Sequence, residues 1–226
     1  MPNELIWIVF AITNFAFFLL SYKLLGRLGI FLWIVLATIL ANIQVLVVVD
    51  LFTIEANLGN ILYGTIFLGT DVLNEIYGKK EAKKAVFIGF AAMFISVIIM
   101  LLAIQFTPNP DDWAMPHLIE IFGFLPIVFL ASMTAFIVSQ LVDIYIFSKI
   151  KEKLPETKFL WLRNNGSTLI SQLVDTLIFV PIAFATVFTA PIIFKLILST
   201  YIIKLIVAIL DTPVIYIAKK IKPLEN

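Results

Sequence analysis

Cysteine is absent from the 226 residues, and histidine occurs once, at His117. The protein therefore has no disulfide, no thiolate nucleophile and no cysteine–histidine metal site. Charged side chains are also scarce: they make up 14% of the residues, about half the share in a soluble domain. The formal net charge of +1 leaves no basic surface to spare, so we expect no nucleic-acid partner.

The sequence also lacks the short motifs of common enzyme classes. HExxH, GxGxxG, the Walker A motif and GxSxG do not occur. Asp111 and Asp112 lie between prolines and do not form a calcium-binding loop. His117 lies in a predicted outer loop, where it has no serine to activate. We therefore expect no enzyme, no metal site and no cofactor.

Long apolar runs fill most of the chain instead. Apolar residues account for 62% of the sequence, more than a soluble protein of this length could bury. A helix needs about 20 apolar residues to cross the hydrocarbon core of a membrane. The runs predict seven such segments, at residues 5–22, 29–49, 57–77, 84–106, 121–148, 166–190 and 192–218. The expected fold is an all-α integral membrane protein, a polytopic bundle of helices in a single domain over residues 1–226.

Two of these segments are ambiguous. Residues 57–77 contain Asn57, Asn60 and Asp71, and such polar residues are tolerated where backbone is buried in protein or lines a cavity. The alternative is therefore six spans, with this segment re-entrant or the first one at the interface. The amino terminus lacks the basic region of a signal peptide, so we interpret the first segment as a retained span. Pro126 is expected to kink or to begin the fifth.

The basic residues indicate the orientation of the bundle. All 16 of them except Lys195 and Lys204 lie in or beside alternate predicted loops and the carboxyl terminus. Basic loops stay in the cytoplasm. The sequence thus predicts an inner- or plasma-membrane protein with its amino end outside and its carboxyl end in the cytoplasm. The loop at 149–165 is expected inside, and the loop at 107–118 outside.

Acidic side chains inside the predicted spans are the strongest functional signal. They are Asp71, Glu75, Asp143, Asp175 and Asp211, and the deep base that faces them is Lys204. An unpaired acid at the centre of a membrane costs roughly 2.5–3.5 kcal/mol. We predict that Lys204 pairs with Asp211 or Asp175, as a structural or coupling ion pair. Glu75 has a simpler alternative, an interfacial pair with Lys79 one turn later.

The pentapeptide SQLVD occurs twice, at 139–143 and at 171–175. Each copy places an amide and a carboxylate one turn apart on a predicted span. Internal repeats are common in transporters. The alternatives are chance, or polar groups that only hold the two helices together.

These motifs resemble those of the queuosine precursor transporter family, whose members are also called vitamin uptake transporters. The resemblance runs from about Ile34 to Lys219. It is carried by TDVLNEIYGKKEAKK at 70–84, SQLVDIYIF at 139–147 and RNNGSTLISQLVDTLIF at 163–179. It implies a membrane carrier that imports 7-deazaguanine bases such as preQ0, preQ1 or queuine for tRNA modification.

The residues themselves fit a purine-like ligand. A carboxylate accepts hydrogen bonds from adjacent ring N–H and amino groups, and side-chain amides match the remaining edges. We predict a binding site formed by polar residues of the second, third, fifth and sixth segments: Asn42, Asp71, Asn74, Glu75, Gln140, Asp143, Gln172 and Asp175. In particular, we expect Asp143, Asp175, Gln140 and Gln172 to face one central cavity.

Other functions remain open at this level. The chain could carry another small heterocycle or vitamin, or serve as a binding subunit for a separate ATPase. A retinal protein is a third alternative, because Lys204 lies midway along the last span, but fold-level analogy is a weak argument. The expected partners are a small purine-like substrate and membrane lipid, and the oligomer to test is a homodimer.

Overall fold

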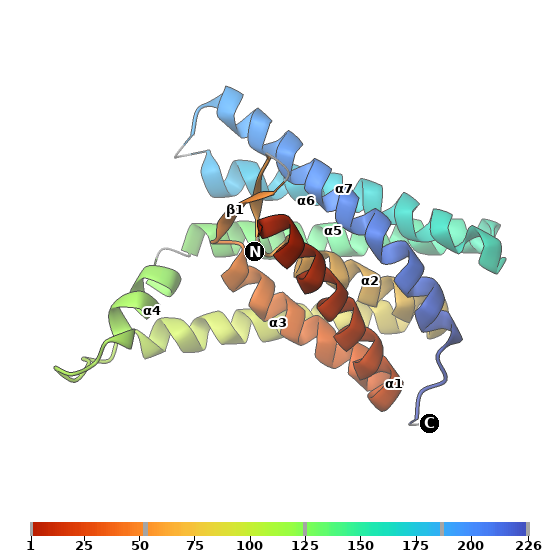
Figure 1. The fold of residues 1–226 in the computed structure, drawn as a ribbon, viewed down its shortest axis with the longest axis horizontal. Helices are drawn as coiled ribbons and strands as arrows, with labels where there is room; N and C mark the ends of the chain where they lie inside the picture. The colour runs from red at the N-terminus through yellow and green to blue at the C-terminus, as the bar shows by residue number, and fades with distance from the viewer. Residues whose placement is uncertain (1, 52–53, 124–125, 186–187, 225–226) are drawn as a thin grey trace.

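The computed structural model describes residues 2–51, 54–123, 126–185 and 188–224, which are mainly helical (Figure 1). The helices are α1 (Asn3–Gln44), α2 (Asn60–Ile76), α3 (Lys79–Ala103), α4 (Ala114–Gly123), α5 (Pro126–Lys153), α6 (Leu160–Phe184) and α7 (Ala190–Lys220). A short 3-10 turn, η1 (Thr157–Phe159), precedes α6. Five helices, α1, α3, α5, α6 and α7, are long and apolar enough to cross a membrane.

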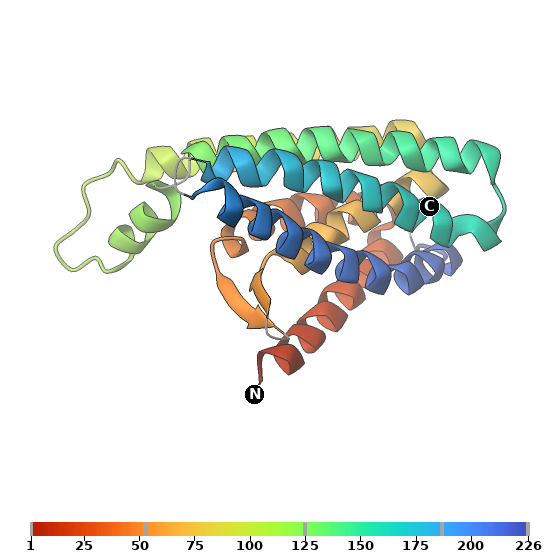
Figure 2. The ribbon, with the colours of Figure 1, turned by 90° about the horizontal axis from the view of Figure 1, so that it is seen from above.

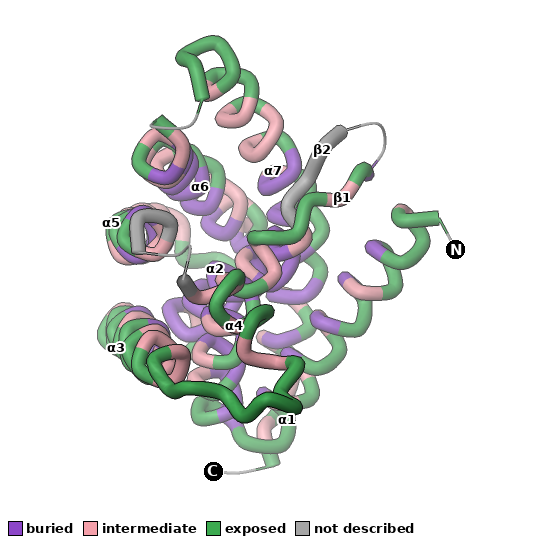
Figure 3. Tube along the Cα trace, turned by 90° about the vertical axis from the view of Figure 1, so that its left-hand side faces the viewer, coloured by how far each residue is buried: buried purple, intermediate pink, exposed green. Residues whose placement is uncertain are grey.

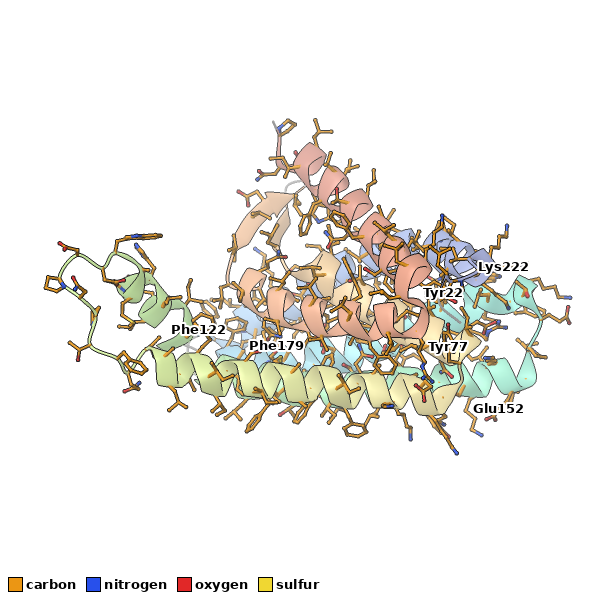
Figure 4. All side chains as sticks on the ribbon, turned by 90° about the horizontal axis from the view of Figure 1, so that it is seen from below. Tyr22, Tyr77, Phe122, Glu152, Phe179 and Lys222 are labelled. Atoms are coloured by element: carbon orange, nitrogen blue, oxygen red, sulfur yellow. The ribbon has the colours of Figure 1, made fainter. Side chains whose placement is uncertain are left out.

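Helix α1 consists of two arms that reverse direction at Gly26 (Figures 1 and 4). Gly26 has φ 55° and ψ −134°, a conformation that side-chain-bearing residues rarely adopt. The arms are so close at the turn that a Cβ on Gly29 would lie 2.0 Å from the carbonyl oxygen of Ser21. The arms correspond to the predicted segments 5–22 and 29–49, although the second ends at Gln44 rather than at residue 49.

Helix α2 lies at the centre of the bundle, in contact with α1, α3, α5, α6 and α7 (Figure 3). Nearly all of its side chains from Asn60 to Asn74 are buried. It is one continuous helix of 17 residues, about 26 Å long. Its polar residues are therefore surrounded by protein. This explains why polar residues interrupt the apolar pattern of the segment 57–77, which made its prediction ambiguous.

A two-stranded antiparallel sheet joins α1 to α2, where we expected only the end of a helix and a loop. Strand β1 (Val48–Leu51) pairs with β2 (Ile54–Asn57), in a register that sets Val48 opposite Asn57. The run Val47–Val48–Val49 consists of β-branched residues, which favour strands over helices. The fold is all-α, as expected, and this short hairpin is an addition that the prediction did not include.

The remaining boundaries differ from the predictions at particular ends. Helix α4 forms within and just beyond the segment expected as the outer loop, 107–118, and packs against α3 to one side of the bundle (Figure 2). Pro126 begins α5, which was one of the two positions expected for it. Helix α6 starts at Leu160, nearly two turns before residue 166, because the chain enters it directly from η1.

The basic segments meet at one end of the molecule. Figure 4 shows Tyr22, Tyr77, Glu152 and Lys222 together at this end. The guanidinium of Arg27 pairs with Glu81 at 3.3 Å, and the Leu224 amide donates to the Lys23 carbonyl at 2.8 Å. We call this the basic end. The residues Phe122 and Phe179 lie in the opposite half (Figure 4).

Polar and apolar residues are distributed inversely to those of a soluble protein. Large apolar side chains such as Ile95 and Leu102 are exposed on the outer helices, 55% and 63% respectively. Acids and amides such as Asp71, Asp143 and Gln140 are fully buried. The distribution is that of a helix bundle in lipid, with polar groups gathered inside.

Candidate binding site

A small cavity lies between α1, α2, α5, α6 and α7, in the half of the molecule opposite the basic end. Its volume is about 50 Å³. The lining residues are Ala41, Asn42, Val45, Gly59, Asn60, Tyr63, Ser132, Ala135, Asp175, Phe179, Thr200 and Lys204. We call it the inner cavity. Five helices contribute to it, and its lining mixes a few polar groups with apolar walls, as in small-molecule sites.

Asp175 is the most heavily bonded group of the inner cavity. One carboxylate oxygen accepts hydrogen bonds from the Tyr63 hydroxyl and, at 3.2 Å, from the Ser139 hydroxyl. The other oxygen forms an ion pair with the Lys204 ammonium. The ammonium also lies 4.9 Å from the centre of the Tyr63 ring, a cation–π contact. One buried carboxylate thus links α2, α5, α6 and α7.

The partner of Lys204 is one of the two acids that we predicted. Asp175 takes the ion pair, and Asp211 instead accepts a hydrogen bond from the Asn164 amide at 2.8 Å. The alternative pairing of Lys204 with Asp211 is therefore not the one present. Lys204 and Asp175 are 7% and 3% exposed at their side chains, so the charges compensate each other away from water.

The two SQLVD blocks bond to each other reciprocally. The first serine of each block donates to the last aspartate of the other: Ser139 to Asp175 at 3.2 Å, and Ser171 to Asp143 at 2.8 Å. Helices α5 and α6 run antiparallel side by side, which places the blocks in this arrangement (Figure 2). The repeat therefore joins the two helices, as one of the alternatives for it proposed. It also places one of its acids, Asp175, in the inner cavity.

The second acid of the repeat has different surroundings. Asp143 lies next to Asp71 of α2, and both side chains are fully buried. Neither oxygen of Asp71 has a hydrogen-bond partner among the described residues, nor does the second oxygen of Asp143. Beside them, Thr70 donates to Gln140 at 3.0 Å. This acidic pair has no basic side chain comparable to Lys204 bonded to it in the described part of the chain.

Glu75 lies at the basic end, where three cations surround it. Arg163 approaches at 2.9 Å, Lys219 at 2.6 Å and Lys151 at 3.6 Å. The proposed local pair with Lys79 is wrong: that ammonium lies over the Tyr145 ring instead, 5.1 Å from its centre. The neighbouring Asn74 amide donates to Ser148 and to the Ile144 carbonyl.

The eight predicted site residues thus occupy three levels of the bundle. Asn42 and Asp175 line the inner cavity. Asp71, Gln140, Asp143 and Gln172 are buried but do not line it. Asn74 and Glu75 lie at the basic end. The structure does not bring Asp143, Gln140 and Gln172 to the same cavity as Asp175, because successive turns of α5 and α6 set them apart.

Sequence reasoning missed four polar residues of the inner cavity: Asn60, Tyr63, Ser132 and Thr200. Asn60 and Tyr63 are three residues apart on α2, a spacing that places them on one helix face. That spacing could have identified them. The Asn60 amide nitrogen is buried and has no hydrogen-bond partner among the described residues, so it can donate to a ligand.

The donors and acceptors of the inner cavity suit hydrogen bonding rather than metal binding. No group of three or more histidine, cysteine, aspartate or glutamate side chains able to hold a metal ion occurs in the described ranges. Asp175 offers a carboxylate, Asn60 and Asn42 offer amides, and Tyr63 offers a hydroxyl and a ring. Such a set recognises a planar polar molecule by its edges and its face.

Known proteins that are similar to this chain are named as transporters. The family described as "Putative vitamin uptake transporter" matches residues 57–218. A "Probable queuosine precursor transporter" of Bacillus subtilis (strain 168) is 47% identical over 223 residues, which cover 99% of this chain and 97% of that protein. The "Queuosine precursor transporter" of Escherichia coli (strain K12) is 27% identical over 165 residues, 72% of this chain and 70% of that protein. No solved structure matches the chain.

Proposed function

Because the chain belongs to the queuosine precursor transporter family and is a multi-pass membrane transporter rather than an enzyme, we propose that it imports 7-deazaguanine bases of the preQ0, preQ1 or queuine type for tRNA modification. The observation that carries the proposal is Asp175, a buried carboxylate of the inner cavity at the meeting point of four helices.

The chemistry of the base matches this carboxylate. A deazaguanine presents a ring N–H and an amino group side by side, and a carboxylate can accept from both. The Asn60 amide nitrogen, which is unpartnered, can donate to the ring carbonyl. Tyr63 and Phe179 offer aromatic faces for the ring. Each edge of the base therefore has a counterpart in the inner cavity.

The bound state requires a rearrangement at Asp175. The inner cavity, at about 50 Å³, is far smaller than the about 300–1,000 Å³ of usual ligand pockets. A base must therefore displace at least one of the present partners of Asp175. Lys204 is the natural candidate, because a donor-rich base replaces its hydrogen bond while the ammonium keeps its contact with Tyr63.

The deeper residues extend the same path. Gln140, Asp143, Gln172 and Asp71 follow Asp175 on the way to the basic end. In our proposal they contact the base after it leaves the inner cavity, and Asn74 and Glu75 mark the exit. The unpartnered amide nitrogen of Gln140 and amide oxygen of Gln172 are consistent with this role.

We further propose seven crossings, with the two arms of α1 counted separately and α2 included. The segments expected in the cytoplasm lie together at the basic end, which supports the predicted orientation (Figure 4). The amino terminus is then outside, the carboxyl terminus inside, and the inner cavity in the outer half. A base entering there moves towards the cytoplasm, which is the direction of import.

The test is uptake by this protein alone. The gene is expressed in a host that neither makes nor imports 7-deazaguanines, and queuosine in tRNA is measured after feeding preQ0, preQ1 or queuine. We expect at least one base to restore queuosine. Asp175→Asn should lower uptake at least tenfold, while Asp112→Asn, in the segment before α4, should not change it.

Two results would contradict the proposal. Failure of all three bases, with the protein correctly inserted, would favour another heterocycle or dependence on a separate ATPase. Full uptake by Asp175→Asn would show that this carboxylate does not bind the base.

A further inference from the structure

A second and larger hollow lies beside the inner cavity, between α1, α3, α4 and α5. Its volume is about 290 Å³. It is lined by Ile39, Asn42, Ile43, Met93, Ser96, Val97, Ile99, Met100, Phe122 and Phe129. We call it the outer cleft. Phe122 marks its position in the half of the molecule away from the basic end (Figure 4).

Asn42 lines both hollows and separates them. Its amide nitrogen donates to the Thr38 carbonyl at 2.8 Å and contacts the Met93 sulfur. Its amide oxygen accepts from Ser132 at 2.7 Å. Ser132 belongs to the inner cavity and Met93 to the outer cleft, so the wall between the two consists of side chains held by a few hydrogen bonds.

Size and recognition chemistry are divided between the two hollows. Ligand pockets usually measure about 300–1,000 Å³. The outer cleft, at about 290 Å³, is near the lower end of that range, whereas the inner cavity, at about 50 Å³, is far below it. The charged groups, Asp175 and Lys204, belong to the inner cavity. A planar base therefore fits first in the outer cleft and is recognised in the inner cavity.

Aromatic side chains connect the two. Phe122 and Phe129 of the outer cleft pack in one cluster with Phe179, which lines the inner cavity. Phe179 in turn packs edge-on against Phe184, with ring centres 6.0 Å apart. Ring faces and the methionine sulfurs of Met93 and Met100 suit the face of a heterocycle. Phenylalanine side chains that pack against the same two buried alanines, Ala131 and Ala183, thus line both hollows.

We propose that the outer cleft is a first binding site for the transported base, and that Asn42 is the partition through which the base reaches Asp175. This inference rests on the proposed function and adds a second site to it. The ring packs between phenylalanine and methionine side chains, and an edge of the base takes over the hydrogen bonds of Asn42. Rotation of Asn42 away from Ser132 then opens the way inward.

A lipid acyl chain is the competing occupant of an apolar cleft in a membrane protein. An acyl chain would use neither the amide of Asn42 nor the hydroxyl of Ser96, the polar side chains that line the cleft. It would also not account for the shared wall with the inner cavity. The experiments below separate the two occupants.

The first experiment uses the absence of native cysteine. Ser96→Cys places one thiol in the outer cleft, and Ile95→Cys places one on the adjacent exposed position as a control. The purified proteins are labelled with a small maleimide with and without saturating preQ0. We expect preQ0 to slow labelling of Ser96→Cys at least fivefold and to leave Ile95→Cys unchanged. The same protection should persist when Asp175→Asn is added, because the outer cleft does not contain that acid.

Protection by added phospholipid but not by preQ0 would overturn the inference in favour of an acyl chain. Loss of protection in the Asp175→Asn background would also overturn it, since preQ0 would then occupy one site only. Uptake by the wild-type protein is measured in parallel. Absent uptake and absent binding refute the proposed function itself, whereas normal uptake without protection refutes the outer site alone.

The second experiment fills the cleft. Ser96→Trp should reduce the initial uptake rate at least tenfold, while equilibrium binding of preQ0 to purified protein stays within about threefold. Ile95→Trp, which points away from the cleft, should change neither quantity. An unchanged uptake rate in Ser96→Trp would show that the base does not pass through the cleft. The melting temperature of each variant distinguishes blocked passage from misfolding.

Discussion

At the scale of single residues, the two buried acids that form ion pairs, Asp175 and Glu75, have different surroundings. Asp175 has one cation, two hydroxyl donors and a cavity beside it. Glu75 has three cations around it and lines neither of the two hollows described above. Removing one partner of a buried pair is costly, because the other charge is left without compensation in a medium of low polarity. Both sites therefore allow sharp mutational tests.

The first prediction concerns Lys204. Lys204→Met strands the Asp175 carboxylate and should destabilise the protein by roughly 3–5 kcal/mol, the usual cost of breaking a buried pair. Thermal unfolding of the purified protein measures the change. Adding Asp175→Asn should restore most of the stability, because the asparagine is neutral.

The control for this prediction lies on the same helix. Lys195→Met removes an exposed ammonium from α7 and should change stability by no more than about 0.5 kcal/mol. If Lys204→Met with Asp175→Asn is as unstable as Lys204→Met alone, the ion pair does not explain the loss.

The second prediction concerns Glu75. Glu75→Gln leaves Arg163, whose side chain is fully buried, without a charged partner. Loss of the Glu75 charge should lower the free energy of unfolding by roughly 3–5 kcal/mol. Thermal unfolding measures the change. Glu152→Gln removes an acid that is 61% exposed and paired with Lys149, and should be nearly neutral. Equal effects of the two substitutions would argue against a special role for Glu75.

The sequence alone predicts that these buried acids need basic partners. It identifies the partner of Asp175 but not the partners of Glu75. Lys204 was recognisable because it is a deep base within the last span. Arg163 was not, because it lies 88 residues from Glu75 and belongs to a segment that looked like a loop. Local spacing instead suggested Lys79. Pairing across helices depends on how they pack, which no local spacing encodes.

At the scale of elements, α2 is held by its buried apolar side chains and by a close approach to α7. A Cβ on Gly64 would lie 2.4 Å from a methyl group of Val207 in α7. At the next residue, Thr65 accepts a hydrogen bond from the Trp33 indole at 2.9 Å, which ties α2 to α1. Small residues at helix contacts are typical of membrane bundles.

The third prediction tests this contact. Gly64→Ala should destabilise the protein by about 1–3 kcal/mol, because Val207 is stiff and cannot move aside cheaply. Adding Val207→Ala should recover part of the loss, which thermal unfolding can measure. Gly166→Ala is the matched control, since its Cβ would meet only the flexible end of Ile150 at 3.3 Å. A harmless Gly64→Ala would mean that α2 and α7 are less tightly packed.

Elements were predictable where their composition was uniform. The long apolar helices α3, α5 and α7 lie close to their expected ranges. The hairpin at 48–57 was missed because its valine run also reads as the end of a span. The reversal at Gly26 was predictable as a loop but not as a turn inside an almost unbroken helix, since only the backbone angles of one glycine produce it.

At the scale of the whole molecule, the fourth prediction concerns orientation. Single cysteines replace Lys153, at the basic end, and Asp112, in the segment before α4. An impermeant thiol reagent applied to intact cells should label the protein with cysteine at 112 and not the one with cysteine at 153. Both should react after the membrane is made permeable. Labelling of the cysteine at 153 alone in intact cells would reverse the proposed topology.

The central position of α2 has a consequence for how the protein is made. A helix of 17 residues that contains Asn60, Asp71 and Asn74 is a poor substrate for direct partitioning into lipid. Its neighbours α5, α6 and α7 are synthesised after it. During biosynthesis α2 must therefore wait, sheltered at the translocation machinery or held beside α1 and α3, until the later helices enclose it. Assembly of this transporter is thus completed only once its last helix has left the ribosome.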